Sequence, residues 1–201
     1  QASRSVTIFV PHGNSVAKNA AMRALGAEGV ELGAVFPEAR ERSLEVAAER
    51  GLEPVPPFHR DLVLGVATYA LELFHGAGPL DTVYVPVGMG SGINALIAVR
   101  DLLGLDTSIV GIVSEAAPST LLSFQRGEVV PTESASTFVD GVATRSPDAE
   151  AIAGIVAGAA RIIAVADDAT AEAMRIIYRT THNVAESAGA IALAGLLSER
   201  L

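Results

Sequence analysis

Short apolar runs rich in β-branched residues alternate with helix-length segments along most of this chain. Runs such as "YVPV" (84–87) and "IVGIV" (109–113) are apolar at consecutive positions, so both of their faces are suited to burial. Strands of this kind, separated by helices of 10–15 residues, are typical of parallel βαβ units. We therefore predict an α/β fold in which parallel sheets are flanked by helices in three layers.

A proline cluster at 54–57 separates a shorter from a longer part of the chain. We therefore predict two lobes, a small N-terminal lobe over 1–57 and a larger lobe over 58–201. Residues 127–146 are rich in turn formers and are expected to be irregular. We expect strands at 5–10, 29–35, 81–87, 107–114 and 161–166, and helices at 16–25, 37–50, 61–75, 92–103, 117–126, 147–158, 168–180 and 184–198.

The chain is acidic, with 14 Lys and Arg residues against 23 Asp and Glu residues and a formal net charge of −9. Its basic residues are scattered singly, which argues against a nucleic-acid partner and against an anionic membrane surface. The most apolar segment, 151–166, is interrupted by Arg161 and is too short to span a bilayer. Because no signal-peptide pattern and no cysteine is found, we expect a cytoplasmic protein.

The stretch "VYVPVGMGSGINALIAVRDLLG" (83–104) places Gly88, Gly90 and Gly92 between an expected strand and an expected helix. Glycine allows positive φ angles and close backbone approach, and a helix start presents unpaired N–H groups at its positive end. This combination suits a bound phosphate, to which Ser91 would add a hydroxyl donor.

The spacing of the glycines indicates which kind of phosphate-containing ligand the turn could bind. A dinucleotide-binding turn requires a glycine where Ile93 stands, and a Walker loop requires a lysine that is absent here. A single phosphate monoester therefore fits better than a pyrophosphate. The alternative is an ordinary βα turn whose small residues serve helix–sheet packing.

Four further segments accompany the glycine turn: "VPHGNSVAKNAAMRALGAEGVEL" (10–32), "PPFHRDLVLGVATYALELF" (56–74), "FVDGVATRSPDAEAI" (138–152) and "RTTHNVAESAGAIALAGLL" (179–197). In order and spacing, the five segments resemble the threonine/serine dehydratase branch of the fold type II (tryptophan synthase β-like) pyridoxal-phosphate enzymes. The resemblance covers nearly the whole chain. It implies a two-lobed fold, pyridoxal 5'-phosphate as cofactor, a small amino-acid substrate and a homodimer, with 1–57 belonging to the small lobe and 58–201 to the cofactor-binding lobe.

The resemblance also implies roles for individual residues. Backbone groups at the glycine turn would hold the cofactor phosphate, the segment "DGVA" would lie beside the cofactor ring, and "AESAGA" would line the pocket. Without the resemblance, Gly141 is a plain turn glycine and Glu186 an exposed helix carboxylate. The implied cofactor-binding residues are Gly88, Met89, Gly90, Ser91, Gly92, Gly141, Val142 and Glu186.

Three motifs of the family are missing from this sequence. The lysine that binds the cofactor covalently stands in a Ser-Phe-Lys-x-Arg-Gly-Ala-type motif, whereas the one lysine here, Lys18, follows "PHGN" and is expected on a solvated helix face. The Ser-x-Gly-Asn-His loop and the later Ser-Gly-Gly-Asn segment are also absent. We therefore expect the middle of a longer enzyme, lacking roughly a hundred residues before it and a few tens after it. No catalytic residue is assigned, and the chain alone is expected to be inactive.

The resemblance implies that the full-length protein is a dehydratase (ammonia-lyase) that converts threonine or serine to a 2-oxo acid and ammonia. Two alternatives stay open. One is a non-catalytic module that binds a phosphate or the cofactor without the lysine. The other is a related lyase or racemase of the serine racemase, hydroxyaspartate or phenylserine type, because the segments that select the substrate lie largely outside these motifs.

No metal site is expected. Some relatives bind a divalent cation through acidic residues after the strand at 109–113, but the matching positions here carry Val113 and Ser119. His182 and Glu186 are four residues apart and would share one face of a helix, yet no third ligand accompanies them. We therefore interpret them as a pair at the edge of the pocket.

Asp167 and Asp168 precede the expected helix 168–180. A carboxylate at a helix N-cap accepts hydrogen bonds from unpaired N–H groups and complements the positive end of the helix dipole. We therefore predict a helix N-cap at this place rather than a catalytic pair of carboxylates.

Overall fold

The computed structural model describes residues 5–33 and 36–199, and the chain divides into two compact units, Gln1–Pro56 and Pro57–Leu201. The division falls inside the proline cluster at 54–57. We call the two parts the small unit and the large unit.

The small unit is a parallel βαβ arrangement followed by one helix. Its two strands pair in parallel, with Thr7 opposite Glu28, and the crossover that parallel pairing requires is a helix. The strand expected over 29–35 is shorter, and residues 34–35 lie outside the described residues. The elements are β1 (Thr7–Val10), α1 (Val16–Ala24), β2 (Glu28–Glu31) and α2 (Phe36–Arg50).

The large unit is built around three parallel strands in the order β3-β4-β5. They are β3 (Thr82–Pro86), β4 (Ser108–Ser114) and β5 (Arg161–Val165). The central strand β4 is buried from Ile109 to Ser114, as its uninterrupted apolar run predicts. The predicted α/β class, with parallel sheets flanked by helices, is confirmed.

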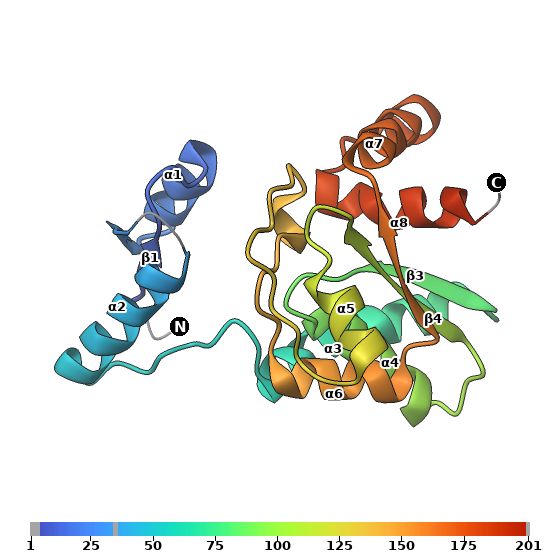
Figure 1. The fold of residues 1–201 in the computed structure, drawn as a ribbon, viewed down its shortest axis with the longest axis horizontal. Helices are drawn as coiled ribbons and strands as arrows, with labels where there is room; N and C mark the ends of the chain where they lie inside the picture. Colours follow the sequence, from blue (N-terminus) through green and yellow to red (C-terminus); the bar gives the residue numbers. More distant parts are fainter. Residues whose placement is uncertain (1–4, 34–35, 200–201) are drawn as a thin grey trace. The chain divides into compact units, whose positions relative to one another are not determined.

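Helices cover both faces of this sheet (Figure 1). On one face α4 packs on β3 and β4 and also contacts α3 and α6, whereas on the other face α8 contacts all three strands and carries α7 on its outer side. The bounds are α3 (Arg60–Gly76), α4 (Ser91–Leu102), α5 (Ser119–Arg126), α6 (Ala149–Gly158), α7 (Asp167–Thr181) and α8 (Ser187–Ser198). Among the described residues, no helix combines the length and the apolar character needed to cross a membrane.

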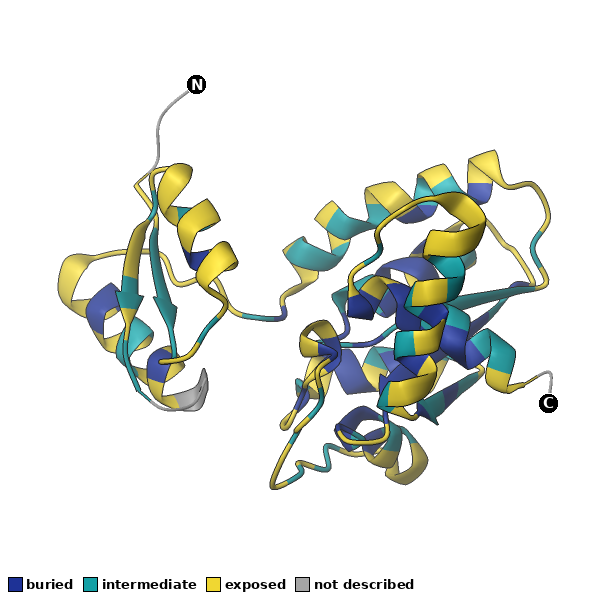
Figure 2. Cartoon of the chain, turned by 90° about the horizontal axis from the view of Figure 1, so that it is seen from above, coloured by how far each residue is buried: buried dark blue, intermediate teal, exposed yellow. Residues whose placement is uncertain are grey.

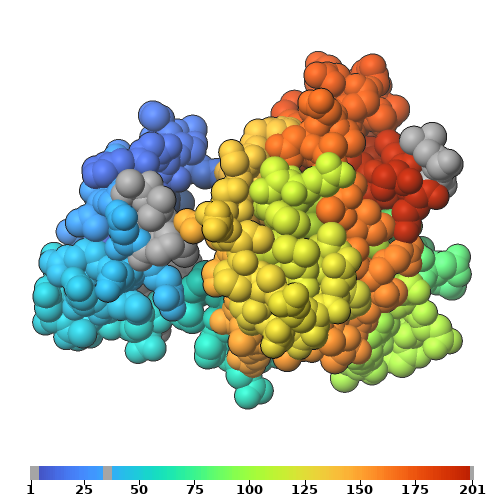
Figure 3. Space-filling model, in the orientation of Figure 1, coloured from blue at the N-terminus to red at the C-terminus, as the bar shows by residue number. Residues whose placement is uncertain are grey.

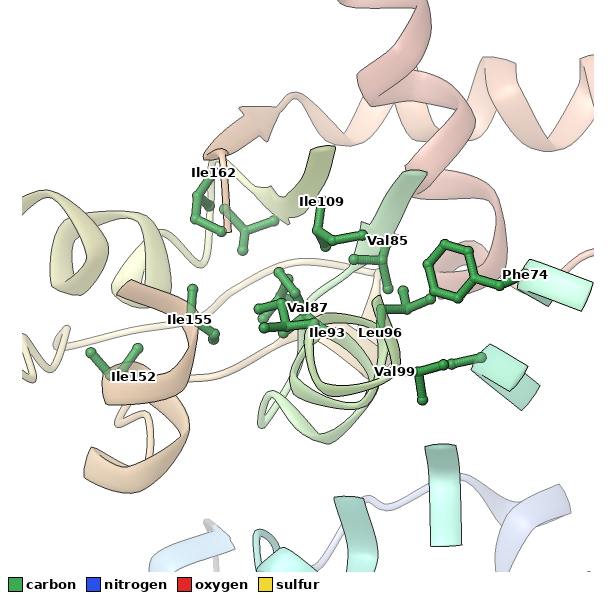
Figure 4. Close-up of a cluster of buried hydrophobic side chains, with 13 residues drawn as sticks. Phe74, Val85, Val87, Ile93, Leu96, Val99, Ile109, Ile152, Ile155 and Ile162 are labelled. Carbon is green, nitrogen blue, oxygen red and sulfur yellow. The ribbon is translucent and has the colours of Figure 1, made fainter. Parts of the chain in front are cut away.

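Alternate residues of β4 contribute to two separate core clusters. Ile109 packs with residues of α3, α4 and α6 (Figure 4), and Val113 belongs to the same cluster, whereas Val110 and Ile112 pack with α8. Gly111 lies between them, where a Cβ atom would come within 2.5 Å of Ile162 Cδ1. Because residue 111 has no side chain, the side chains of Ile162, Val87 and Ile93 can pack directly against the backbone at the centre of the sheet.

The segment between α5 and α6 has little regular structure, as its turn-forming composition predicts. Figure 3 shows α5 and this segment as a continuous strip across the visible face of the large unit. One short 3-10 helix, η1 (Asp140–Val142), interrupts it. The fold brings η1 to the turn between β3 and α4, where the sequence predicts the functional site.

Candidate functional site

The turn between β3 and α4 is tight and depends on glycine. Gly90 is the N-cap of α4 and has a left-handed backbone, with φ 98°. It is also buried, and a Cβ atom there would stand 3.1 Å from the Cβ of Ala151. Both the φ angle and the space therefore favour glycine at this position.

The same turn presents backbone donors without protein partners. The N–H of Val87 donates to the carbonyl of Ile112 at 2.9 Å, but the N–H groups of the next three residues, 88–90, find no acceptor within residues 5–33 and 36–199. The first turn of α4 adds further N–H groups and contains no acidic residue. Unpaired donors at the positive end of a helix fit an anion such as a phosphate group.

Asn94 ties this turn to α6. Its Nδ2 atom donates to the carbonyl oxygen of Gly90 at 2.8 Å and to that of Ala151 at 3.1 Å. The Asn94 side chain has room because residue 154 is a glycine: a Cβ atom there would lie only 2.0 Å from Asn94 Oδ1. Sequence reasoning missed Asn94, although two glycines four residues apart, at 154 and 158, indicate that another helix approaches α6 closely.

Tyr69, on α3, supports the turn from another side. Its hydroxyl donates to the carbonyl oxygen of Gly92 at 3.2 Å. Burial raises the pKa of Tyr69 to about 12. A phenol is protonated at neutral pH even at its ordinary pKa, so this hydroxyl is available as a donor. Nothing in the sequence near Tyr69 signals this role, because its acceptor is 23 residues away.

Close contacts join the turn to η1, and η1 to the start of α8. A Cβ on Gly88 would stand 2.4 Å from the carbonyl oxygen of Gly141, and a Cβ on Gly141 would stand 2.6 Å from the Cβ of Ala188. η1 therefore contacts both the glycine turn and the start of α8 closely through Gly141, although the three segments are far apart in the sequence. These segments carry the predicted phosphate-binding residues, the predicted ring-side residues and the last predicted motif.

The structure places the predicted residues as follows. The positions 88–92 form the turn and the first residues of α4, Gly141 and Val142 belong to η1, and Glu186 is the N-cap of α8. Gly141 is exposed, whereas Val142 is 1% exposed and packs in the core beside α8. A contact between η1 and a ligand would therefore come from Gly141 or from backbone atoms, with Val142 serving as an anchor.

Glu186 is exposed, and its carboxylate bonds to no side chain in the described parts of the chain. The expectation that it shares a helix face with His182 is wrong. His182 ends α7 with a left-handed backbone, φ 57°, and α8 begins only at Ser187, so the chain between them is not helical. The last helix consequently starts three residues later than the sequence predicts.

The two positions that the resemblance matches to a cation site, Val113 and Ser119, are buried in this chain. Val113 belongs to the core on the α4 side, and Ser119 donates from Oγ to the carbonyl oxygen of Thr144 at 2.6 Å. Within the described ranges, no group of three or more His, Cys, Asp or Glu residues is placed to hold a metal ion. Ser119 therefore supports the segment after η1.

The sequence matches the family model described as pyridoxal-phosphate dependent enzyme over residues 2–201. It is 35% identical over 192 residues to the biosynthetic L-threonine dehydratase IlvA of Salmonella typhimurium, and 28% identical over 194 residues to the L-threonine ammonia-lyase of Thermotoga maritima. These alignments cover 94% and 96% of the chain but only 37% and 48% of the two relatives. The chain thus spans less than half the length of either curated relative.

Solved structures share the fold. The processed form of threonine deaminase isoform 2 from Solanum lycopersicum superimposes with a TM-score of 0.89 at 30% identity, covering 95% of this chain and 56% of that one. Maize serine racemase superimposes with a TM-score of 0.92 at 22% identity, covering 98% and 60%, a likeness that concerns the fold alone. A family match that runs through both units, over a fold shared with these structures, shows that the chain belongs to the pyridoxal-phosphate-dependent enzymes.

Proposed function

We propose that the full-length protein is an ammonia-lyase that uses pyridoxal 5'-phosphate to convert a β-hydroxy amino acid, threonine or serine, to a 2-oxo acid and ammonia. The observation that carries this proposal is the contact between the glycine turn and η1, where Gly88 lies against Gly141. A phosphate site with the exposed Gly141, which has no side chain, beside it suits a flat aromatic phosphate ester. The names of the relatives, threonine dehydratase and L-threonine ammonia-lyase, support the reaction.

In this proposal the chain binds and orients the cofactor. Pyridoxal phosphate supplies an electron sink for the amino acid attached to it. The unpaired N–H groups of residues 88–90 hold the phosphate, and Asn94 and Tyr69 fix the turn that presents them. Gly141 leaves room for the ring. A phosphate held in one place restricts where the ring lies relative to the bonds that react.

We further propose that the lysine that holds the cofactor lies outside residues 1–201. The one lysine of the sequence, Lys18, stands on α1 of the small unit. The chain covers 37% of the Salmonella relative, so most of a protein of that length would lie beyond these residues. As the resemblance implies, we expect the full-length protein to form a homodimer.

The proposal is tested with the full-length protein and a panel of L-threonine, L-serine and threo-3-hydroxyaspartate. We expect 2-oxo acid and ammonia in equal amounts, measured by a coupled dehydrogenase assay and an ammonia assay, from threonine, serine or both. Product that is only the D-amino acid would indicate a racemase. A protein that binds the cofactor but converts none of these substrates would contradict the proposed reaction.

A second candidate function is a module that binds the phosphate or the cofactor without catalysis. The observation that favours it is the single lysine at position 18. Borohydride reduction of residues 1–201 with pyridoxal phosphate, followed by mass spectrometry, should give no stoichiometric adduct on Lys18. A coding frame that contains a Ser-Phe-Lys-type motif before Gln1 would favour the enzyme, and a natural start at that position would favour the module.

A further inference from the structure

Asp167 lies in the first turn of α7, and the N-cap expected there is instead Ala166. The Asp167 carboxylate bonds to two other segments of the large unit. Oδ1 accepts from the hydroxyls of Ser114 and Thr137, both at 2.7 Å, and Oδ2 accepts from Thr137 at 2.9 Å and from the N–H of Phe138 at 3.3 Å. One carboxylate therefore joins the end of β4, the start of α7 and the segment that leads into η1.

The segment that Asp167 holds leads directly to the candidate site. The hydroxyl of Thr137 also accepts from the N–H of Val139 at 3.0 Å, and Val139 is fully buried beside α8. Val142, at the end of η1, donates its N–H to the carbonyl oxygen of Val139 at 3.0 Å. Gly141 therefore lies in the chain between the buried residues Val139 and Val142, and its carbonyl oxygen faces Gly88.

The other end of this segment is held independently. The Ser119 hydroxyl donates to the Thr144 carbonyl oxygen at 2.6 Å, and both residues are buried. The Thr144 hydroxyl in turn lies 3.9 Å from the sulfur of Met89 in the glycine turn. Residues 137–144 are therefore fixed at both ends, and their middle contacts the turn that would hold the phosphate.

The attachment at Asp167 is the stronger of the two because its acceptor is charged. Desolvation acts to raise the pKa of Asp167, but hydrogen bonds from Ser114, Thr137 and the N–H of Phe138 outweigh it and lower the pKa. The carboxylate is consequently ionised at neutral pH. The neighbouring Asp168 is exposed and takes part in none of these bonds, which makes it a matched control.

We propose that Asp167 is a positioning residue of the cofactor site, which holds residues 137–142 so that Gly141 stays against Gly88. This inference rests on the proposed function, because it concerns the same site. Asp167 acts through Thr137 and Phe138 and not by contact with the cofactor. Replacing the carboxylate by an amide leaves one neutral acceptor oxygen and sets an NH2 donor against the hydroxyl and N–H donors of Ser114, Thr137 and Phe138, so these bonds weaken, η1 loosens and the glycine turn loses the backbone that it packs against.

The test compares Asp167→Asn with Asp168→Asn in the full-length protein. We expect Asp167→Asn to weaken the binding of pyridoxal 5'-phosphate about tenfold, measured by fluorescence titration, because it disrupts hydrogen bonds to a charged group. Asp168→Asn should leave the affinity within about twofold. In the protein without cofactor, the amides of Val139, Val142 and Thr144 should exchange with deuterium about tenfold faster in Asp167→Asn alone.

A third variant separates positioning from general stability. Ile162→Ala opens a cavity in the core on the α4 side, away from residues 137–144, and should lower the denaturation midpoint while leaving exchange at 139–144 unchanged. If Asp167→Asn does not fold, Thr137→Val tests the same bonds. Unchanged exchange in the Asp167 or Thr137 variant overturns the proposal, as does an equal loss of cofactor affinity in Ile162→Ala. A wild-type protein that binds no cofactor would instead contradict the proposed function, while the exchange comparison would still decide the role of Asp167.

Discussion

The two units of this chain use the same βαβ arrangement with very different amounts of buried structure. In the small unit β1 is half-buried and β2 is mostly exposed, whereas in the large unit β4 is buried along nearly its whole length. Figure 2 shows the contrast, with exposed and intermediate colours dominating the small unit and buried residues concentrated in the large one. The buried residues described in the small unit are Asn19, Ala39, Val46 and Ala47.

In the small unit, the strand β2 carries charged side chains that form exposed ion pairs instead of packing in a core. Glu31 pairs with Arg23 at 2.9 Å and Glu28 with Arg50 at 3.3 Å, and all four side chains are at least 39% exposed. Exposed ion pairs add little stability. The comparison shows that a parallel βαβ pattern predicts a topology, whereas a site with rigid backbone donors additionally requires helices packed on both faces of the strands.

The largest difference between the units should appear in their cores. Ile112→Ala removes a fully buried side chain of β4 that packs against Gly195, and we expect it to lower the free energy of unfolding by about 3–5 kcal/mol. Val46→Ala, in α2 of the small unit, should cost about 1 kcal/mol because few buried neighbours surround it. Urea denaturation measures both values, and equal losses would contradict the contrast between the units.

The second effect concerns the backbone contact at the site. Gly88→Ala places a methyl group only 2.4 Å from the carbonyl oxygen of Gly141. We expect this overpacking to lower the free energy of unfolding by about 1–3 kcal/mol. Binding of pyridoxal 5'-phosphate should weaken about tenfold, because the turn must shift. Fluorescence titration of the full-length protein measures the affinity.

Gly65→Ala is the matched control for Gly88→Ala. Gly65 lies inside α3, where an added Cβ meets nothing within 4 Å. Alanine is the better helix former, so this substitution should raise stability by about 0.5–1 kcal/mol and leave cofactor binding unchanged. If Gly88→Ala behaved like Gly65→Ala, the turn and η1 would not depend on their close approach.

The glycine turn could be predicted from the sequence because its properties are local. Three glycines between a β-branched run and a helix start determine a tight turn with unpaired donors, and these properties need no distant partner. The alternation of apolar strands and helices predicted the layers in the same way. The resemblance to a family was needed for Gly141 and Glu186, because a turn glycine and a helix-start carboxylate occur in many proteins.

The residues that support the turn could not be predicted, because each acts across a long stretch of sequence. Asn94 reaches a carbonyl oxygen 57 residues away, and Asp167 joins partners that are 30 and 53 residues away. The direction of a side chain in an irregular segment is equally non-local. Val142 was expected beside the ring, but its side chain lies in the core, a placement that only the packing of α8 determines.

Removing the Tyr69 hydroxyl, which donates to the Gly92 carbonyl oxygen next to the glycine turn, should have a smaller effect on stability and on cofactor binding. Tyr69→Phe removes the hydrogen bond to the Gly92 carbonyl oxygen but keeps the ring, and we expect a loss of about 1 kcal/mol in stability. Cofactor affinity should fall about threefold, since Asn94 still holds the turn. Tyr178→Phe, on an exposed face of α7, should change neither quantity. Two variants with equal effects would mean that the Tyr69 hydroxyl does not support the turn.

We expect the smallest effect on stability from removing one ion pair, and one pair from each unit can be compared. In the large unit, Arg161 donates to Glu199 at 2.7 and 2.6 Å, and Tyr84 also donates to that carboxylate. Hydrogen bonds from Arg161 and then Tyr84 lower the pKa of Glu199 from 4.5 to about 2. Glu45, in the small unit, pairs at 2.8 Å with Arg42, three residues earlier on α2, and Arg42 also pairs with Glu49 at 3.5 Å.

A pKa that is lower in the folded than in the unfolded state makes a stabilising contribution above about pH 4.5, which is lost as the pH falls toward 2. Glu199→Gln removes this contribution, so its denaturation midpoint should lie below that of the wild type at pH 7, and the two should converge by about pH 2. Glu45→Gln should follow the wild type throughout, because an exposed ion pair within one helix contributes little. Parallel curves for Glu199→Gln and the wild type down to pH 2 would show that the Arg161 pair is as weak as the pairs of the small unit, and the contrast between the units would then be one of apolar burial alone.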